Sequence, residues 1–332
     1  VGLAYLLEYL DYTIKTPEEL DEAYGISTLG VIGNIKGINR ARTPAELLVA
    51  VTQPRSLVSE AFRALVTNIR FAIPGTPVRS LLITSAGPLE GKTLTSANLA
   101  AILAQGGRSV ILVDTDLRRP RLHRLFEVAR EPGFTDLVVF DGASSGGQGP
   151  EGMEAHVHDI GMHNYLQPTL VPGLRLLASG TLPHNPAELL GSNRTVEVMS
   201  WLKDQADIVV YDSPPAATVT DAAVLSSRVD AVVHVVKAGG PRRDIVVRVR
   251  AVLEKVGARV LGPVLNQVSL SDLGYYSSYY YGYYPDHESS RKRSTRRPRR
   301  RPRRRRRRKP EAGFEDEPAS APPGEGTADG QE

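Results

Sequence analysis

The chain has 332 residues, 41% of them apolar, which is enough to bury the core of one large domain with further segments at its ends. It contains no cysteine, which excludes a disulfide framework and a thiolate metal site. The net charge of +4 conceals a segregation, because residues 291–309 hold 15 Lys and Arg while residues 310–332 hold seven Asp and Glu and no base. Residues 1–290 are therefore mildly acidic, and the basic character of the protein belongs to its tail.

The N-terminal segment is predicted to be helical over residues 1–25 and to continue as a Gly-, Pro- and Arg-containing linker over residues 26–56. Thr16 followed by Pro17 is typical of a helix N-cap and first turn. The apolar opening is too short to cross a bilayer, which takes about 20 apolar residues. Glu8 and Asp11 interrupt it and argue against a signal peptide. It is interpreted either as an ordinary amphipathic helix or as the end of a transmembrane helix at which the chain is cut.

A phosphate-binding loop follows a predicted helix over residues 57–72 and a strand over residues 79–85. Its sequence matches the P-loop pattern except at the first position, where Ala stands for Gly. Backbone N–H groups of such a loop point at phosphates, and the helix that follows adds its dipole. The predicted ATP-binding residues are Ala86, Gly87, Pro88, Leu89, Glu90, Gly91, Lys92, Thr93 and Leu94. Among them Lys92 would neutralise the β- and γ-phosphates, and the Thr93 hydroxyl would hold Mg²⁺.

Three aspartates follow two further apolar runs, at residues 109–113 and 207–211. Continuous apolar runs suit strands buried on both faces of a parallel sheet, whose carboxyl ends meet at one edge. An aspartate after a strand is also a common helix cap or turn residue. Beside a phosphate loop, however, carboxylates fit metal binding and nucleophile orientation. The predicted catalytic residues are Lys92, Asp114, Asp116 and Asp212, with Thr93, Asp114 and Asp212 as the metal ligands.

The remaining elements alternate regularly, with strands near 174–178, 231–236 and 259–265 and helices near 93–105, 119–127, 186–205, 220–228 and 241–256. This alternation predicts an α/β fold of the P-loop NTPase type, with a doubly wound, mostly parallel sheet and helices on both faces. The predicted domain covers residues 57–270. Residues 141–164 are rich in Gly and Ser and are expected to form a mobile surface insertion.

Together these motifs resemble the bacterial tyrosine kinases of capsule and exopolysaccharide synthesis, which share a P-loop branch with the Min and Par ATPases. The likeness covers roughly residues 5–285. It includes the helix from Glu60 to Arg70, the Asn-Pro-Ala-Glu-Leu-Leu segment at 185–190 and a tyrosine-rich segment after residue 274. The loop departs from the family at Leu89, where Gly is usual, and the helix departs at Val66, where a second Arg is usual. Gly87 stands where a Min or Par ATPase should show Lys.

The resemblance implies an ATP-dependent protein-tyrosine autokinase at the cytoplasmic face of the bacterial inner membrane. It implies that Arg118 and Asn266 contact the nucleotide, and that Glu60, Arg63 and Asn68 contact the next subunit of a homo-oligomeric ring. A membrane-embedded polysaccharide co-polymerase segment and a cognate tyrosine phosphatase are the further partners that it implies. The rival interpretations are a Min- or Par-type ATPase switch that binds membrane or DNA through the tail, and a co-polymerase module whose P-loop has decayed.

The C-terminal region divides into a tyrosine cluster, residues 271–290, and a disordered basic then acidic tail, residues 291–332. The cluster is either a low-complexity segment or the substrate. Beside a kinase-like site the substrate interpretation predicts phosphorylation in trans of Tyr275, Tyr276, Tyr279, Tyr280, Tyr281, Tyr283 and Tyr284. The basic run is a solvated charge block, a site for anionic lipid or a clamp for phosphotyrosines. Nucleic acid fits less well, because no aromatic side chains lie within the run.

Overall fold

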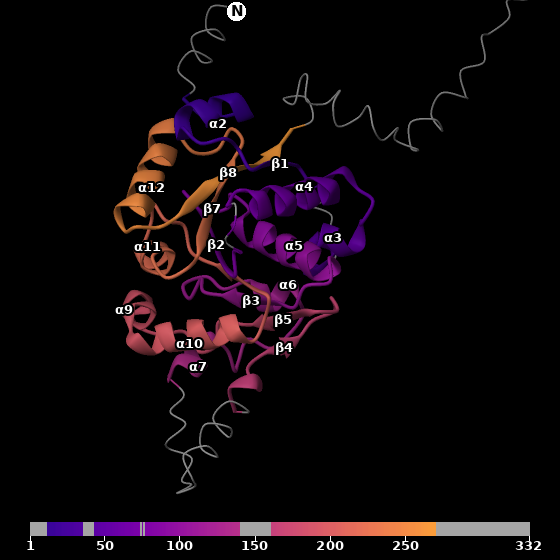
Figure 1. Cartoon of the computed structure of the whole chain (residues 1–332), viewed down its shortest axis with the longest axis vertical. Coiled ribbons are helices and arrows are strands. Elements are labelled where there is room, and N and C mark those ends of the chain that lie inside the picture. Colours follow the sequence, from indigo (N-terminus) through magenta and orange to yellow (C-terminus); the bar gives the residue numbers. More distant parts are fainter. Residues whose placement is uncertain (1–11, 36–42, 74, 76, 140–160, 270–332) are drawn as a thin grey trace, which may run out of the picture. The chain divides into compact units, whose positions relative to one another are not determined.

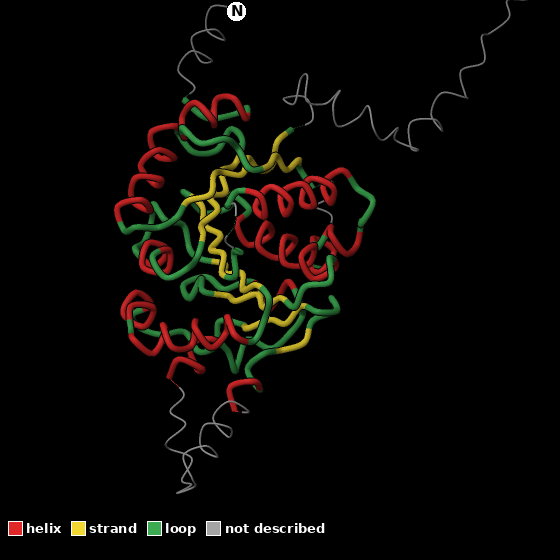
Figure 2. Tube along the Cα trace, viewed as in Figure 1, coloured by secondary structure: helices red, strands yellow, loops and turns green. Residues whose placement is uncertain are grey.

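The computed structural model describes residues 12–35, 43–73, 75, 77–139 and 161–269. Their centre is an eight-stranded sheet in the order β1-β8-β7-β2-β6-β3-β5-β4 (Figures 1 and 2). Neighbouring strands run parallel except β4 and β5, which are antiparallel. The strands are β1 (Gly30–Gly33), β2 (Ser80–Ser85), β3 (Val110–Asp114), β4 (Gln167–Pro168), β5 (Leu174–Leu177), β6 (Ile208–Asp212), β7 (Ala231–Lys237) and β8 (Val260–Val268).

Helices cover both faces of the sheet, which confirms the predicted fold class (Figure 1). One face carries η2 (Pro44–Leu47), α3 (Val49–Thr52), α4 (Leu57–Phe71), α5 (Lys92–Gln105) and α6 (Leu122–Leu125). The other carries α2 (Pro17–Tyr24), α7 (Phe134–Val139), α9 (Pro186–Gly191), α10 (Asn193–Asp204), α11 (Asp221–Ser226) and α12 (Arg243–Lys255).

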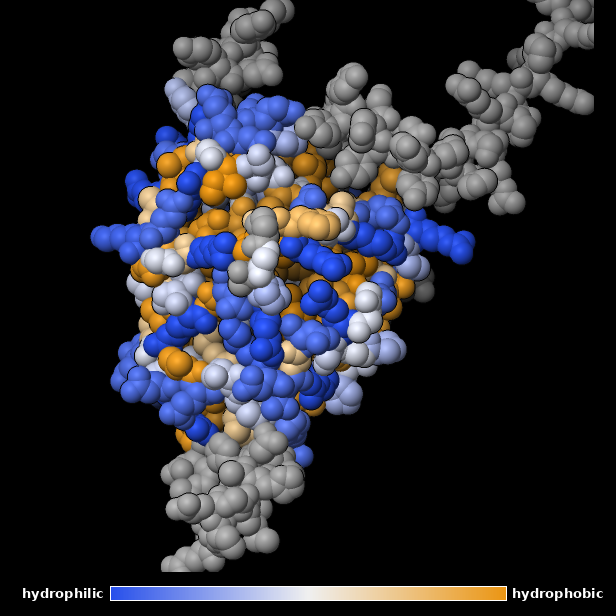
Figure 3. Space-filling view, in the orientation of Figure 1, coloured by the Kyte–Doolittle hydropathy of each residue, from blue (hydrophilic) through white to orange (hydrophobic). Residues whose placement is uncertain are grey.

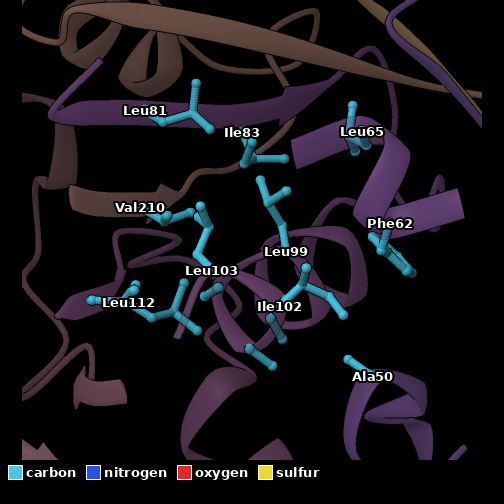
Figure 4. Packing of buried hydrophobic residues seen from close by; sticks show 14 of the residues in the cluster. Ala50, Phe62, Leu65, Leu81, Ile83, Leu99, Ile102, Leu103, Leu112 and Val210 are labelled. Carbon is cyan, nitrogen blue, oxygen red and sulfur yellow. The ribbon is translucent and has the colours of Figure 1, made fainter. Parts of the chain in front are cut away.

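Alternate residues of the central strands enter two separate cores, because successive side chains of a strand point to opposite faces. Leu81 and Ile83 of β2 join the core under α4 and α5, whereas Leu82 between them joins the core under α10 and α12. Figure 4 shows the first of these cores, in which Leu99 of α5 lies beside Ile83 of β2 and Phe62 of α4 lies farther from the strands. A sheet buried on both faces explains why its strands read as unbroken apolar runs.

The N-terminal part differs from the sequence prediction in two ways. Of the helix expected over residues 1–25, residues 1–11 lie outside the described part of the chain, and α2 begins at Pro17, with Thr16 as its cap in a complete capping box with Glu19. The expected linker contains β1, which pairs in parallel with β8 at the edge of the sheet. Asn68 of α4 donates from its side-chain amide to the Leu29 carbonyl at 2.8 Å and so fastens the start of this strand.

Several other observed helices and strands differ from the predicted ones. The predicted helix over 186–205 is two helices, because Ser192 is extended and accepts a hydrogen bond from the Thr195 N–H as the N-cap of α10. The helix predicted near 119–127 is reduced to α6, and α7 and β4 were missed. The tyrosine cluster, the tail and most of the Gly- and Ser-rich insertion lie outside the described residues. Within the described ranges, no helix combines the length and apolar character that a bilayer crossing requires.

Candidate active site

The ends of three adjacent strands bring the predicted site residues together. The phosphate loop follows β2, which is hydrogen-bonded to β6, and β6 in turn pairs with β3. Asp114 and Asp212 are direct register partners, and Asp212 is also aligned with Ile83 of β2. The two carboxylates therefore lie side by side beneath the loop at the carboxyl edge of the sheet.

The loop has two residues in the left-handed region, Leu89 with φ +63° and Gly91 with φ +92°. Gly91 is required twice over, because a Cβ atom there would lie 2.1 Å from the Asn266 amide nitrogen. At Leu89 the same conformation is unfavourable, because a residue with a Cβ atom destabilises the fold by about 1–2 kcal/mol there. Its side chain is 76% exposed. The departure from the family pattern at Leu89 thus falls on a strained backbone position.

The ends of β7 and β8 support the phosphate loop through the Lys237 backbone N–H and the side chains of Asn266 and Gln267. The Asn266 side-chain amide donates to the Glu90 carbonyl at 2.8 Å, and Gln267 donates to the Leu89 carbonyl at 3.3 Å. The buried Glu90 carboxylate accepts from the backbone N–H groups of Gly87 and Lys237. Burial raises the pKa of Glu90 to about 7, against these hydrogen bonds. Asn266, expected at the nucleotide, is used here to hold the loop backbone.

Lys92 lies among the carboxylates at the first turn of α5. Its Nζ atom is 2.7 Å from Asp116 Oδ2 and 3.9 Å from Asp212 Oδ2. Burial would lower the pKa of Lys92, but the attraction of Asp212 and Asp116 is stronger and raises it above its usual range. The ammonium group is therefore charged and held where the phosphates of a bound nucleotide would meet it.

Asp114 and Asp212 are fully buried, and each has one carboxylate oxygen without a hydrogen bond from any described residue. The other oxygen of Asp114 accepts from the N–H groups of Arg121 and Leu122 at 3.1 and 3.0 Å. The other oxygen of Asp212 accepts from the Ser96 hydroxyl at 3.1 Å. Burial is the main cause that raises the pKa of both groups, with Asp212 adding to the effect on Asp114.

Two buried carboxylate oxygens without hydrogen bonds, one of them 3.9 Å from Lys92 Nζ, are a costly arrangement unless a further cation completes it. Together with the nearby Thr93 hydroxyl they form a set of hard oxygen donors, which suits Mg²⁺. No group of three or more His, Cys, Asp and Glu side chains among the described residues could hold a metal alone. Mg²⁺ commonly binds through one or two carboxylates and completes its shell with phosphate and water.

Arg118 contacts a residue that the sequence did not single out. Its guanidinium group donates through Nε and Nη2 to the two carboxylate oxygens of Asp221, at 2.8 and 3.0 Å. Asp221 is fully buried at the first position of α11. The pair joins the loop after β3, which carries Asp116, to the segment after β6. Asp221 resembles an ordinary helix-start residue, so nothing in its local sequence could have revealed this contact.

The predicted interface residues have partners within the chain. Glu60 and Arg63 form an ion pair on α4, and Arg63 also donates to the Pro54 carbonyl at 2.7 Å. Their side chains remain 35% and 38% exposed, so both are available to a neighbouring molecule. Asn68 instead supports β1, as described above.

Comparison with known proteins places this site in a known family. The model of the CobQ/CobB/MinD/ParA nucleotide binding domain matches residues 82–274. Over 250 residues the chain is 33% identical to the tyrosine-protein kinase YwqD of Bacillus subtilis, covering 72% of this chain and 95% of that protein. It is 31% identical over 284 residues to the tyrosine-protein kinase etk of Escherichia coli, covering 81% of this chain but 36% of etk.

Solved structures agree in both sequence and fold. The kinase domain of the Escherichia coli tyrosine kinase ETK is 32% identical, with a TM-score of 0.66 over 77% of this chain and 95% of that one. The chimerical protein CapA2B2 is also 32% identical, with a TM-score of 0.65 over 76% of this chain and all of the other. Both similarities extend beyond the phosphate loop to most of the described fold.

Proposed function

The chain belongs to the bacterial tyrosine-protein kinases of the CobQ/CobB/MinD/ParA P-loop family, and we propose that it transfers the γ-phosphoryl group of ATP to tyrosines 275–284 of neighbouring copies. The observation that carries this proposal is the position of Lys92 between Asp116 and Asp212, beside two buried carboxylate oxygens that accept no hydrogen bond from the described residues. Such an arrangement suits phosphates, a divalent cation and a hydroxyl nucleophile at one place.

In this reaction each side chain has a separate task. The backbone of the loop binds the phosphates, and Lys92 neutralises charge on the β- and γ-phosphates. Asp114, Asp212 and Thr93 would hold Mg²⁺, which would supply electrostatic stabilisation to the transferring group. When the phosphates attract Lys92, Asp116 Oδ2 loses the lysine and becomes free to accept a proton, while Oδ1 still accepts the Arg119 backbone N–H.

The transfer forms one phosphorus–oxygen bond and breaks another. The tyrosine oxygen forms a bond to the γ-phosphorus, and the bond between that phosphorus and the β–γ bridging oxygen breaks. The phenolic proton passes to Asp116, which is 5% exposed, and ADP leaves with the bridging oxygen. Asp114 is less suited to this role, because it is fully buried and one of its oxygens already accepts two backbone N–H groups.

Transfer between copies requires an oligomer, and we place its contact on α4, where Glu60 and Arg63 are half exposed. Each phosphate adds roughly −1.5 to −2 charges, so several in one cluster would repel one another and loosen the oligomer. By homology the chain takes part in capsule or exopolysaccharide production, and we infer that this switch acts there, at the inner face of the bacterial membrane. A membrane co-polymerase segment and an opposing phosphatase are the partners that such a cycle needs.

The first test is phosphotyrosine mass spectrometry after incubation of the full chain with Mg²⁺ and ATP. The parent should carry phosphate between Tyr275 and Tyr284, and Lys92→Ala should carry none. Lys203→Ala is the matched control, because it removes a Lys–Asp pair at 2.8 Å on the far end of β7 and should leave labelling intact. Bound ATP with an unlabelled cluster would contradict the proposal and favour an ATPase switch of the Min or Par kind.

A mixing experiment separates transfer between copies from transfer within one. Lys92→Ala, which keeps its tyrosines, is mixed with an active chain that lacks residues 275–284. Phosphate on the Lys92→Ala chain is expected, because the only competent site belongs to the other molecule. Labelling of the parent that is independent of protein concentration, with an unlabelled Lys92→Ala chain in the mixture, would refute transfer in trans.

A further inference from the structure

Tyr12 is the one exposed tyrosine in the described part of the chain. Its side chain is 59% exposed, whereas Tyr24 and Tyr211 are fully buried and Tyr165 is partly buried. A buried phenol cannot enter the active site of another molecule while its own fold is intact. Among the tyrosines that the structure describes, Tyr12 is therefore the candidate for an acceptor outside the cluster at 275–284.

Few contacts hold Tyr12 at the start of α12. Its carbonyl accepts a hydrogen bond from the Arg243 N–H at 3.0 Å. Further along the chain, the Ile14 carbonyl accepts from the Gly239 N–H at 2.8 Å, and the Ile14 side chain is buried in the core that includes Val246. The chain is therefore anchored at Ile14, and Tyr12 can leave α12 without unfolding of the core.

This anchor lies at the same edge of the sheet as the active site. Gly239 comes shortly after Lys237, the last residue of β7, and β7 pairs in parallel with β2, which leads into the phosphate loop. The Lys237 N–H donates to Glu90 of that loop at 3.4 Å. A phosphate on Tyr12 would therefore be added close to the strand end that supports the phosphate loop.

A guanidinium group already lies over the Tyr12 ring. The Cζ atom of Arg242 is 5.8 Å from the ring centre, which is a cation–π contact. Arg242 also pairs with Asp244 at 3.0 Å, but these two side chains are 64% and 57% exposed, so the pair contributes little to stability. A phosphate carries roughly −1.5 to −2 charges and can accept two parallel N–H bonds from one guanidinium group. Arg242 can therefore exchange an exposed carboxylate for a phosphate on Tyr12 at little loss.

The surroundings of Tyr12 are polar and contain a second base. Arg243 pairs with Glu22 of α2 at 3.3 Å, and both side chains are exposed. Figure 3 shows hydrophilic side chains at the top of the described fold, where Figure 1 places α2. An added phosphate would meet water and guanidinium groups here, which favours ordering of the segment over disruption of an apolar contact.

We propose that Tyr12 is an acceptor of this kinase separate from the tyrosine cluster, and that Arg242 binds the phosphate that Tyr12 receives. The inference rests on the proposed function, because the phosphoryl group comes from ATP in the active site of a neighbouring copy. The Tyr12 oxygen forms a bond to the γ-phosphorus, and the bond from that phosphorus to the β–γ bridging oxygen breaks. The phenolic proton passes to Asp116 of the neighbouring copy, and ADP leaves. Transfer occurs while Tyr12 is away from α12, and the phosphate then fastens it there.

The charge of the phosphate sets the expected size of the effect. A hydrogen bond to a charged group is stronger than a neutral one, and one such bond changes an equilibrium constant by roughly tenfold. The hydrogen bond from the Arg243 N–H to the Tyr12 carbonyl should therefore open about tenfold less often after phosphorylation. Hydrogen exchange at the Arg243 amide reports this opening directly.

Mass spectrometry of the full chain after incubation with Mg²⁺ and ATP tests the acceptor role. Fragment ions should locate phosphate at Tyr12 in the parent, as distinct from Tyr5 and Tyr9, and should find none there in Lys92→Ala. Tyr24 is the internal control, because it is buried and should stay unlabelled. Phosphate on the tyrosine cluster with none at Tyr12 would overturn this inference and leave the proposed function intact. No phosphate at either place would contradict both.

Phosphotyrosine incorporated at position 12 during translation tests the binding of the phosphate without any kinase activity. In the full chain without ATP, exchange at the Arg243 amide should be about tenfold slower with phosphotyrosine than with tyrosine. Arg242→Gln should abolish this difference between the two forms. Arg248→Gln is the matched control, because it removes an exposed base from the same helix and should keep the difference. Equal exchange with and without the phosphate in the parent, or an undiminished difference in Arg242→Gln, would overturn the assignment of Arg242.

Discussion

The buried Glu90 gives the sharpest test of the loop geometry. Its carboxylate accepts the backbone N–H groups of Gly87 in the phosphate loop and of Lys237 at the end of β7, and burial raises its pKa from the ordinary 4.5 to about 7. Between these two values the folded chain binds a proton that the unfolded chain releases, so the free energy of unfolding falls as pH rises through this window. Each pH unit is worth about 1.4 kcal/mol, hence roughly 3 kcal/mol in all.

Glu90→Gln removes this dependence because an amide cannot ionise. The variant loses one hydrogen bond, since its NH₂ group faces a backbone N–H, which costs about 1 kcal/mol at every pH. The free energy of unfolding of the variant minus that of the parent should therefore increase by roughly 2–3 kcal/mol as the pH rises from 5 to 8. The pH-dependent contributions of Asp114 and the other buried groups are present in both proteins and cancel in the difference.

Urea unfolding of both proteins without nucleotide, at pH 5, 6, 7 and 8, measures that difference directly. Glu127→Gln, at an exposed position, is the control and should change stability by less than about 0.5 kcal/mol throughout. A difference between Glu90→Gln and the parent that stays flat from pH 5 to pH 8 would refute the assigned burial of Glu90. A difference of the opposite slope would show that the hydrogen bonds to the ionised carboxylate outweigh its burial.

Three further predictions concern the support of the site. Leu89→Gly should raise the free energy of unfolding by up to about 1 kcal/mol, since relief of φ strain exceeds the added entropy of the unfolded chain, whereas Leu89→Ala keeps the strain and should not. Equilibrium unfolding in urea compares the two. Arg118→Ala should lower the free energy of unfolding by about 1–3 kcal/mol, because the buried Asp221 carboxylate loses its donors. The double variant Arg118→Ala, Asp221→Ala should lose less than the sum of the two single variants. Strictly additive losses would argue against an interaction between the two side chains. Asn266→Ala should weaken binding of a fluorescent ADP analogue several-fold, because it removes a hydrogen bond worth about 1 kcal/mol from the phosphate loop. An unchanged dissociation constant would show that the loop keeps its conformation without this hydrogen bond.

The central strands were predictable because burial on both faces leaves a simple trace in sequence. Val110 to Val113 and Ile208 to Tyr211 are apolar at every position, and all are buried. The edge strand β1 carries no such trace, because Gly30 and Gly33 flank only two apolar residues. Its pairing with β8 depends on the completed sheet, so no window of local sequence contains the information that makes it a strand.

The residues of the active site were likewise partly predictable from local sequence and partly dependent on distant contacts. Motif spacing brought Lys92 and three aspartates to one edge of the sheet, since strand ends and a phosphate loop have few possible arrangements. The contacts that hold this edge in shape join residues far apart, as in the pair of Arg118 with Asp221, 103 positions later. The resemblance assigned Asn266 to the nucleotide, and only coordinates could reveal its hydrogen bond to the loop. The tyrosine cluster and its transfer chemistry remain predictions for the experiments above.

The support of the phosphate loop by β8 also has a consequence for the order of events during synthesis. Asn266 lies 176 residues after the Glu90 carbonyl that it holds. At about 5–20 residues per second, a ribosome needs roughly ten to thirty-five seconds to cover that interval. During this time the phosphate loop has been synthesised but β8 has not, and β1 also lacks β8, its partner in the sheet. A nascent chain therefore completes its nucleotide site at nearly the last step of folding, just before its own tyrosine segment emerges from the ribosome.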